Sequence, residues 1–396
     1  MKEKRPMQKK GIDILFFERP LVDLKKFAFK IAKEIKKKDS SVFMGAVCIE
    51  LPTEEEKKES FIDYFYHRKQ IKNIDDFLIS QEVKIIVFTQ CRIPDLEFIL
   101  HAKKLGIKTI MLQEGVMFDG MNINDVSAAN AISVIGQLSK VFEYLNIVRH
   151  MCRYDGKSFV KVIAEVLKKK KNITMIVEAQ FSMRLIAEYI LTMGEYWDEY
   201  YMSHHGYTKD QIRLIGDHDL DGFIPGGKKE EAICYIANAL VEDGSAKKKD
   251  LEKFLASFAD LVDKTTKLYV KLHPRSDQSL YKILNDHNIE YIRNGRLPSV
   301  NVYVGHRSAL LGRALYESDN LIIWKFPNEE FSFYERYATA VCTNKKELEN
   351  ALKLVDISSH TNDKLEAISK VYWNNPKGSM KCAAELIYDY MKGIKI

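Results

Sequence analysis

A histidine that stands between two cations is the residue of this chain best suited to acid–base chemistry. His273 follows the apolar run Lys267–Leu272, and Pro274 ends that run as a strand because proline cannot donate to the ladder of a sheet. An imidazole titrates near neutral pH and can pass a proton to a phosphate oxygen, while Lys271 and Arg275 favour an anionic leaving group. We therefore predict that His273 is a general acid. The plainer alternative is a structural histidine at the end of a strand.

Two short acidic motifs are candidates for the matching base. Glu114 comes directly after the apolar run Lys108–Leu112, and Gly115 lets the backbone turn closely past a substrate. A carboxylate at that position can take the proton of an attacking hydroxyl group. Asp243, in the triplet Glu242-Asp243-Gly244, is the competing base. A carboxylate that only caps a turn or a helix is the alternative for Glu114.

Two further polar segments also follow apolar runs. In Gly305-His306-Arg307-Ser308, Ser308 is placed to cap the next helix, whose free N–H groups and dipole attract a phosphate. The acidic segment Asp217–Asp221 invites a metal site, but it lacks the distant glutamate of a calcium-binding loop. We therefore expect an acidic loop near the site there, and no bound metal.

These polar segments stand at the ends of short apolar runs that alternate with amphipathic helices, a pattern typical of doubly wound parallel sheets. In such sheets ligands bind beyond the carboxyl ends of the strands. Between about residues 126 and 200 the spacing is mostly helical, and the alternation then starts again. The main expected strands are Ile12–Phe17, Ser41–Ile49, Lys84–Thr89, Lys108–Leu112, Gln211–Gly216, Ala232–Ala237, Lys267–Leu272, Val300–Val304 and Leu321–Trp324.

The length of 396 residues and this interrupted alternation predict an α/β protein of more than one domain. We expect residues 1–200 to form an N-terminal Rossmann-like domain with a helical connector. Residues 201–375 should form a second Rossmann-like domain. Residues 376–396 should form a C-terminal helix that packs back on the N-terminal domain.

The composition excludes several classes of protein. Six scattered cysteines make no C-x-x-C pair, which indicates reduced thiols in a cytoplasmic protein. The balance of 61 basic against 55 acidic residues gives a net charge of only +6, so we expect no nucleic-acid partner. No apolar stretch could span a bilayer, and no signal peptide is recognisable. We expect at most a peripheral membrane contact, for which the run Lys168–Lys171 is the candidate.

On these motifs the chain resembles the bacterial polysialyltransferases and related capsule sialyltransferases. That family carries an acidic-acidic-Gly motif at the end of its first domain, a Lys-x-His-Pro motif in its second, and a later serine motif after a strand. The matching segments here are Gln113-Glu114-Gly115, Lys271-Leu272-His273-Pro274 and His306-Arg307-Ser308. Two positions depart from the family: Gln113 replaces the first acid, and the paired serine is reduced to Ser308 followed by Ala309.

The resemblance implies a GT-B fold, in which two Rossmann-like domains face a central cleft. It also implies an inverting, metal-independent transfer of an acidic sugar from a CMP donor, with no cofactor. The sugar stays open between sialic, legionaminic and pseudaminic acid and Kdo. The acceptor would be a cell-surface glycan or glycolipid of capsule, lipooligosaccharide or O-antigen, made near the inner membrane or capsule assembly proteins.

By the same resemblance Glu114 would be the base and His273 the acid. The residues that would bind the nucleotide sugar are Lys271, Pro274, Arg275, Gly305, His306 and Ser308. A CDP-glycerol or CDP-ribitol phosphotransferase of the teichoic-acid type is one alternative, although such enzymes typically carry His-Gly where this chain has Glu114-Gly115. A non-catalytic GT-B scaffold of a capsule assembly complex is the other.

Overall fold

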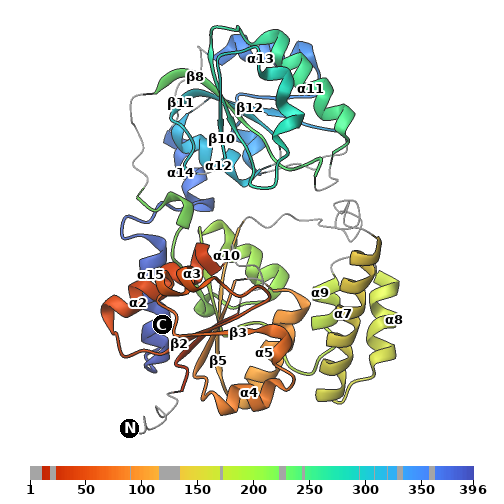
Figure 1. Cartoon of the computed structure of the whole chain (residues 1–396), viewed down its shortest axis with the longest axis vertical. Coiled ribbons are helices and arrows are strands. Elements are labelled where there is room, and N and C mark those ends of the chain that lie inside the picture. The colour runs from red at the N-terminus through yellow and green to blue at the C-terminus, as the bar shows by residue number, and fades with distance from the viewer. Residues whose placement is uncertain are drawn as a thin grey trace, which may run out of the picture. The chain divides into compact units, whose positions relative to one another are not determined.

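The computed structural model describes residues 11–17, 24–89, 91–115, 134–169, 173–222, 229–242, 246–293, 295–306, 308–318, 320–327, 333–355 and 362–396. The chain divides into two compact units. The first consists of Met1–Glu114, Val141–Asp221 and Trp373–Ile396, and the second of Gly115–Lys140 and Gly222–Tyr372. Each unit is built on one parallel sheet with helices on its faces (Figure 1).

The sheet of the first unit has the strand order β3-β2-β1-β4-β5-β6-β7, and its described pairings are all parallel. The order reverses between β1 and β4, which is the switch point of a doubly wound sheet. The strands are β1 (Ile14–Phe17), β2 (Met44–Cys48), β3 (Tyr64–His67), β4 (Ile85–Phe88), β5 (Lys108–Leu112), β6 (Tyr189–Thr192) and β7 (Ile212–Leu214).

Both faces of this sheet are covered by helices and buried. Successive residues of a strand point to opposite faces, so neighbours in sequence fall in different apolar clusters. Leu15 belongs to the apolar cluster on one face, and its neighbour Ile14 belongs to the cluster on the other. Helix α5 is followed by Gly106, whose φ of +69° suits glycine at a helix C-cap. The covering helices are α4 (Ile74–Ser80) and α5 (Ile93–Leu105) on the first face, and α2 (Phe29–Lys38) and α15 (Ser379–Met391) on the second.

A helical insertion separates β5 from β6. It consists of α7 (Val134–Tyr154), α8 (Phe159–Lys169) and α9 (Ile173–Glu178), which lie beside α5 in Figure 1. Met151 of α7 and Val162 of α8 are buried in the same apolar cluster as α5. The insertion is therefore packed onto the first sheet's helical layer, as the mostly helical spacing of this part of the sequence predicts.

The sheet of the second unit has the order β10-β9-β8-β11-β12-β13, again with parallel pairings. The order reverses between β8 and β11, so this unit is doubly wound as well. Helices α11 (Lys248–Leu261) and α13 (Lys345–Leu354) bury one face, while α12 (Ala309–Glu317) packs on β11, β12 and α14 (Asn362–Val371). The strands are β8 (Glu230–Ile236), β9 (Lys267–Lys271), β10 (Ile289–Ile292), β11 (Val300–Gly305), β12 (Asn320–Trp324) and β13 (Ala340–Cys342).

The first unit extends beyond residue 200, where we expected it to end. β7 pairs with β6 in the first sheet, with Ile212 beside Ile190, so the chain up to Asp221 belongs to the first unit. The apolar pattern of β7 shows that it is a strand, but it carries no information on which sheet the strand joins. β6 itself lies inside the stretch that we expected to be helical.

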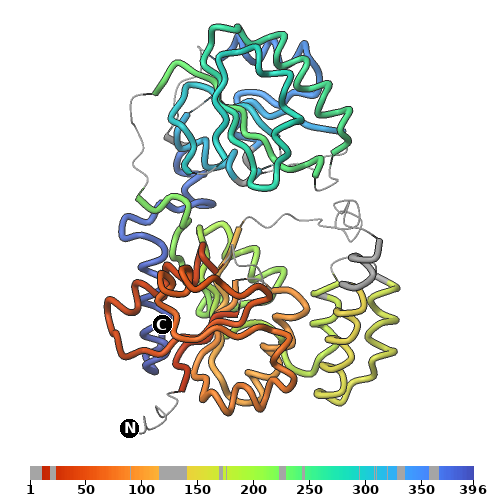
Figure 2. Tube along the Cα trace, in the orientation of Figure 1, coloured from red at the N-terminus to blue at the C-terminus, as the bar shows by residue number. Residues whose placement is uncertain are grey.

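The C-terminal helix returns to the first unit. Met380, Ala384 and Ile387 of α15 are buried in the apolar cluster that includes α2, and the blue end of the trace runs beside the red–orange α2 in Figure 2. Asp221 accepts from the backbone N–H groups of Ser379 and Met380 at 2.6 and 3.3 Å and so caps this helix. Among the described residues, no helix is both long and apolar enough to cross a membrane.

Candidate functional site

The carboxyl ends of three neighbouring strands bring most of the predicted residues to one edge of the second sheet. At the end of β8, Ile236 pairs with Lys271 of β9 on one side and with Gly305 of β11 on the other. The strand order reverses between β8 and β11, where doubly wound sheets bind their ligands. The segment that begins at His306 therefore leaves the sheet at this switch point, and the segment that begins at His273 leaves it one strand away, after β9.

His273 is half-buried, and a backbone contact fixes its tautomer. The backbone N–H of Arg275 donates to Nδ1 of His273 across 3.2 Å. A ring nitrogen that accepts a hydrogen bond carries no hydrogen, so the neutral imidazole holds its hydrogen on Nε2. Nε2–H is therefore the group through which the ring can donate to a phosphate oxygen. Pro274 and Arg275 of the same motif are exposed.

Lys271 is buried, and its ammonium group is used inside the protein. Its Nζ donates to the carbonyl oxygen of Gly295 at 2.8 Å and reaches that of Arg293 at 3.5 Å. Desolvation lowers the pKa of the Lys271 ammonium group, because burial penalises its charged form. We expected Lys271 to bind the donor; the structure instead places its charge on the segment after β10.

His306 is a core histidine, which corrects our expectation that it contacts the donor. Only 1% of it is exposed, and Phe326 stacks on its ring at 4.4 Å between centroids. Nδ1 donates to the carbonyl oxygen of Trp324 at 3.1 Å, and Nε2 accepts from the hydroxyl group of Tyr235 at 2.8 Å. Desolvation lowers the pKa of His306 to about 4, so the ring is neutral at physiological pH. It braces the end of β11 from within.

The turn after β11 is shaped by Gly305 and Ser308. A Cβ atom at Gly305 would lie 2.7 Å from Cδ2 of Leu311 and 3.1 Å from the carbonyl oxygen of Ile236, so glycine lets α12 approach β8. The hydroxyl oxygen of Ser308 accepts from the backbone N–H of Leu310 at 3.3 Å and caps α12, as the sequence predicts. Arg307 lies outside the described residues.

Glu114 lies at the corresponding edge of the first sheet, two residues past the end of β5. Gln113 before it is buried, and its side-chain oxygen accepts from the backbone N–H of Met193 at 3.1 Å, which fastens the end of β5 to that of β6. The residue that departs from the family's acidic pair therefore has a structural task here. No described atom would lie within 4 Å of a Cβ at Gly115. Asp243, the rival base, lies outside the described residues.

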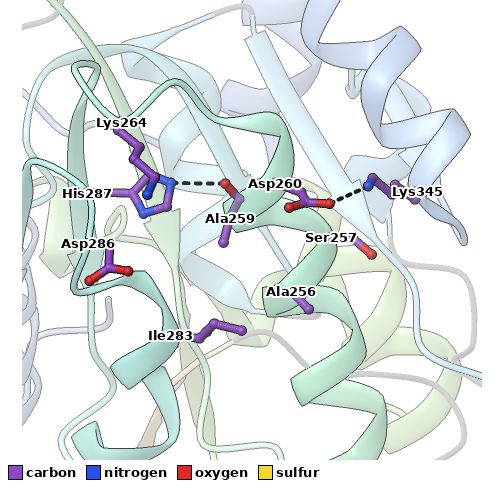
Figure 3. Close-up of a pocket in the computed structure, with 9 residues that line it drawn as sticks. All are labelled: Ala256, Ser257, Ala259, Asp260, Lys264, Ile283, Asp286, His287 and Lys345. Atoms are coloured by element: carbon purple, nitrogen blue, oxygen red, sulfur yellow. Dashed lines mark hydrogen bonds and ion pairs between the residues drawn. The ribbon is translucent and has the colours of Figure 1, made fainter.

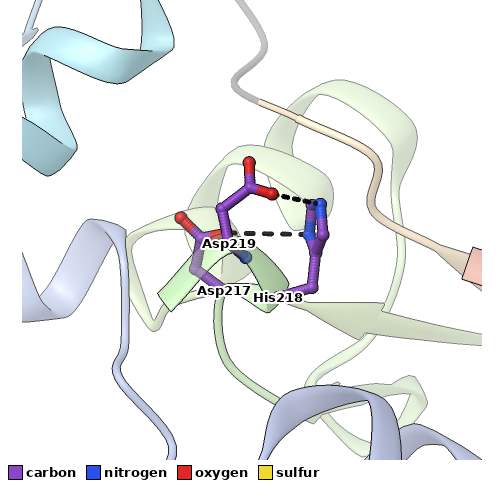
Figure 4. A group of neighbouring side chains, drawn as sticks. All are labelled: Asp217, His218 and Asp219. Carbon is purple, nitrogen blue, oxygen red and sulfur yellow. Dashed lines mark hydrogen bonds and ion pairs between the residues drawn. The ribbon is translucent and has the colours of Figure 1, made fainter. Parts of the chain in front are cut away.

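The acidic segment after β7 is packed into the first unit. His218 is 4% exposed, and its Nδ1 and Nε2 lie 3.6 Å from Asp217 and 3.1 Å from Asp219, respectively (Figure 4). Asp217 is fully buried and accepts from the backbone N–H of Asp219, while Asp221 caps α15. Each acid of this segment thus has a partner of the first unit's own fold. Asp217, His218 and Asp219 each offer one ligand atom, and these atoms lie within 4.8 Å of one another, so the group has the spacing of a metal site.

A surface pocket of about 370 Å³ lies at the end of α11, and none of the predicted residues lines it (Figure 3). Lys345 forms an ion pair of 2.6 Å with Asp260 there, and Nε2 of His287 donates to the carbonyl oxygen of Ala259 at 3.0 Å. This pocket borders the residues that precede β9 and β10, whereas the candidate site lies beyond the carboxyl ends of these strands.

Solved structures with the same architecture cover nearly the whole chain. The UDP co-structure of MnaA from S. aureus has a TM-score of 0.54 at 9% identity and covers 97% of this chain and 98% of its own. The UDP-GlcNAc 2-epimerase of Methanocaldococcus jannaschii has a TM-score of 0.53 at 11% identity, with 95% and 99% covered. The glycotransferase of kitacinnamycin has a TM-score of 0.51 at 13% identity, with 96% and 99% covered. These likenesses confirm the α/β, two-Rossmann GT-B fold class.

Sequence comparison assigns the family. No curated protein matches the chain. The profile of the family described as alpha-2,8-polysialyltransferase matches residues 36–303, which is well over half of the 396 residues and includes Glu114 and the His273 motif. The chain therefore belongs to the alpha-2,8-polysialyltransferase family and is a sialyltransferase-like glycosyltransferase.

Proposed function

We propose that this enzyme transfers an acidic sugar from a CMP donor to a cell-surface glycan, with inversion and without a metal ion. The observation that carries the proposal is the hydrogen bond from the backbone N–H of Arg275 to Nδ1 of His273, beyond the carboxyl end of β9. With Nδ1 held by a backbone N–H, the ring offers Nε2–H to the leaving phosphate. The sugar is sialic, legionaminic or pseudaminic acid, or Kdo, each with a carboxylate at a tertiary anomeric carbon.

In the proposed reaction, the acceptor hydroxyl oxygen forms a bond to the anomeric carbon on the face opposite CMP. The bond from that carbon to the phosphate oxygen breaks, and its electron pair stays on the phosphate. Glu114 receives the hydroxyl proton. His273 donates a hydrogen bond through Nε2, and a complete proton transfer is not needed because a phosphate monoester has a second pKa of about 6. Ser308 and the N-terminus of α12 would face the same phosphate.

Nucleotide selectivity tests the donor. We expect calorimetry of the purified protein to show binding of CMP in the presence of EDTA, and weaker binding of CDP and UDP. A preference for CDP would indicate the polyol phosphotransferase, and a preference for UDP would indicate a relative of the UDP-binding epimerases. No binding of any of the three would favour the scaffold. Activity that requires Mg²⁺ or Mn²⁺ would contradict the metal-independent mechanism.

The base is tested by two matched substitutions. Glu114→Gln keeps the size of the side chain and removes its basicity, and we expect it to lower kcat about a hundredfold or more. Asp243→Asn makes the equivalent change at the rival position and should leave most of the rate. The reverse ranking of the two variants would move the base to Asp243.

We also propose that one face of α8 contacts anionic lipid, which would bring the enzyme to a membrane-bound acceptor. This face consists of Val160, Lys161, Ala164, Leu167 and Lys168, and all five are exposed. Their spacing is that of one helix face, and Val160 and Leu167 are 75% and 66% exposed, although apolar. Apolar side chains flanked by lysines, with no acid among them, complement an anionic lipid surface. Lys170 and Lys171 lie outside the described residues.

Vesicle sedimentation tests this contact. The protein should bind vesicles that contain phosphatidylglycerol and not vesicles of phosphatidylcholine alone. The pair Val160→Ser and Leu167→Ser should weaken the binding, whereas Leu354→Ser, at an exposed leucine of the second unit, should not. Equal binding by all variants would remove α8 from the contact.

A further inference from the structure

The backbone of the His273 loop, defined as residues His273–Asp277, is held by a side chain from the neighbouring strand. Arg293 directly follows β10, and its guanidinium donates to three carbonyl oxygens of the loop. Nη1 lies 3.4 Å from the carbonyl oxygen of His273, 2.9 Å from the carbonyl oxygen of Pro274 and 3.2 Å from the carbonyl oxygen of Ser276. Nη2 also lies 3.2 Å from the carbonyl oxygen of Ser276. A guanidinium group suits this task because its N–H donors point in fixed directions, whereas an ammonium group is a compact charge on a flexible stem.

The contact is reciprocal. Lys271, two residues before His273, donates to the carbonyl oxygens of Gly295 and Arg293, as described above. Each of the two strand-end segments thus sends a cation onto the backbone of the other. The backbone N–H of Leu272 adds a hydrogen bond of 2.8 Å to the carbonyl oxygen of Ile292.

The other end of the loop is held by a residue of the segment that follows β8. Oε1 of Glu242 accepts from the backbone N–H of Asp277 at 2.5 Å. Inside the loop, the backbone N–H of Ser276 donates to the carbonyl oxygen of His273 at 2.9 Å, which closes a tight turn. Arg293 and Glu242 therefore bracket a turn whose middle amide, that of Arg275, contacts the His273 ring.

We propose that Arg293 is a positioning residue that keeps the amide of Arg275 against Nδ1 of His273 and thereby sets the Nε2–H tautomer. This inference rests on the proposed function only for its effect on the rate. The carbonyl oxygens that Arg293 holds belong to the residues on either side of that amide, so release of the clamp lets the turn rotate. A rotated turn no longer supplies the N–H, and the ring then also populates the form that carries its hydrogen on Nδ1.

The alternative role for Arg293 is direct binding of the donor phosphate, because the residue is exposed at the same edge. The two roles differ in what Arg293→Lys changes. A lysine keeps the charge, so phosphate binding would be largely retained. It lacks the rigid fork of donors that spans the three carbonyl oxygens, so the position of the turn would be lost.

The experiment uses the full-length chain with ¹⁵N-labelled histidine, and the His273 signals are assigned by comparison with His273→Gln. In the wild-type protein, nitrogen NMR should show a bare Nδ1 and a protonated Nε2. Arg293→Lys and Arg293→Gln should both shift these signals towards a mixture of the two tautomers. Arg296→Gln is the matched control, since Arg296 donates to the carbonyl oxygen of Gly222 at 3.1 Å.

The kinetic expectation follows from the same geometry. Both Arg293 variants should lower kcat by roughly tenfold to a hundredfold, as small displacements of a reacting group do, and leave the dissociation constant of CMP unchanged. Unchanged tautomer signals in both variants would overturn the positioning role. So would weaker CMP binding in Arg293→Gln that Arg293→Lys restores. A wild-type protein that shows the Nε2–H form but does not bind CMP would overturn the proposed donor and leave the inference on Arg293 intact.

Discussion

Two histidines at the same edge of the second sheet differ in their hydrogen-bond partners. The partners of His306 make it a structural residue, and those of His273 agree with its proposed role as an acid. His306 spends both ring nitrogens on the carbonyl oxygen of Trp324 and the hydroxyl group of Tyr235, so nothing remains for a ligand. Nδ1 of His273 accepts from a backbone amide two residues later, and in the mechanism proposed above Nε2–H acts on the substrate. In both rings Nδ1 bonds to the backbone, but it accepts from an N–H in His273 and donates to a carbonyl oxygen in His306, so the two rings hold opposite tautomers.

Removal of the His273 ring should affect the rate and leave the fold in place. We expect His273→Ala to lower kcat by about two orders of magnitude or more, since a positioned proton donor contributes about that much. The ring is half-buried in a loop, so thermal unfolding should change little. His287→Ala, in the pocket at the end of α11, is the control and should keep the rate. A wild-type rate in His273→Ala would remove this residue from the mechanism.

The buried ring of His306 should make the second unit sensitive to acid. Its folded pKa is about 4 because of desolvation, against 6.5 for an ordinary histidine. As pH falls from 6.5 towards 4, the unfolded ring takes a proton that the folded ring refuses, so stability falls by up to about 3 kcal/mol. Above pH 6.5 this contribution is fully present.

Urea unfolding across this pH range should therefore show a flatter dependence in His306→Gln than in the wild type. The variant should also be less stable near pH 8, because Tyr235 and Trp324 lose a partner. His205 of the first unit, whose pKa burial also lowers to about 4, is present in both proteins and contributes equally. An unchanged slope would contradict the assignment to His306.

At the scale of elements, glycine at the end of β11 sets how closely α12 approaches the sheet. Gly305→Ala should destabilise the protein by roughly 1–3 kcal/mol, because the new Cβ presses on Leu311 and on the carbonyl oxygen of Ile236. Gly115→Ala is the matched control at the end of β5, with no described atom within 4 Å, and should stay within about 0.5 kcal/mol of the wild type. Denaturant midpoints measure both, and equal effects would show that the close approach at Gly305 is unimportant.

The strands that carry the site are those that could be predicted from sequence. β5, β9 and β11 are buried on both faces and read as continuous apolar runs, so the residues after them were found by position alone. The same rule, applied to the short strand β10, points to Arg293, but only the structure shows that its side chain turns back onto the loop. The roles expected for Lys271 and His306 depended on which way each side chain points, and a strand pattern does not encode that for a residue at its end.

At the scale of the whole molecule, the chain enters the first unit, passes into the second and returns, so the first unit is completed by the last residues of the sequence. The pairing of β7 with β6 and the packing of α15 beside α2 depend on contacts within the folded unit, which the local sequence pattern does not specify. The apolar spacing of α15 predicts a helix with one buried face, while its place beside α2 follows from tertiary packing.

Because α15 belongs to the first unit, we expect a substitution in this helix to destabilise the first unit and not the second. Ile387 of α15 is fully buried in the apolar cluster that includes α2, so Ile387→Ala should cost about 2–5 kcal/mol. Hydrogen exchange should show that the loss of protection falls on β1, β2 and α2 of the first unit, whereas β8, β9 and β11 keep theirs and the CMP affinity is retained. Glu385→Ala, at the exposed position two residues earlier, should stay within about 0.5 kcal/mol. Equal loss of protection in both sheets would mean that the units unfold as one cooperative body, and that α15 stabilises the second unit as much as the unit it packs on.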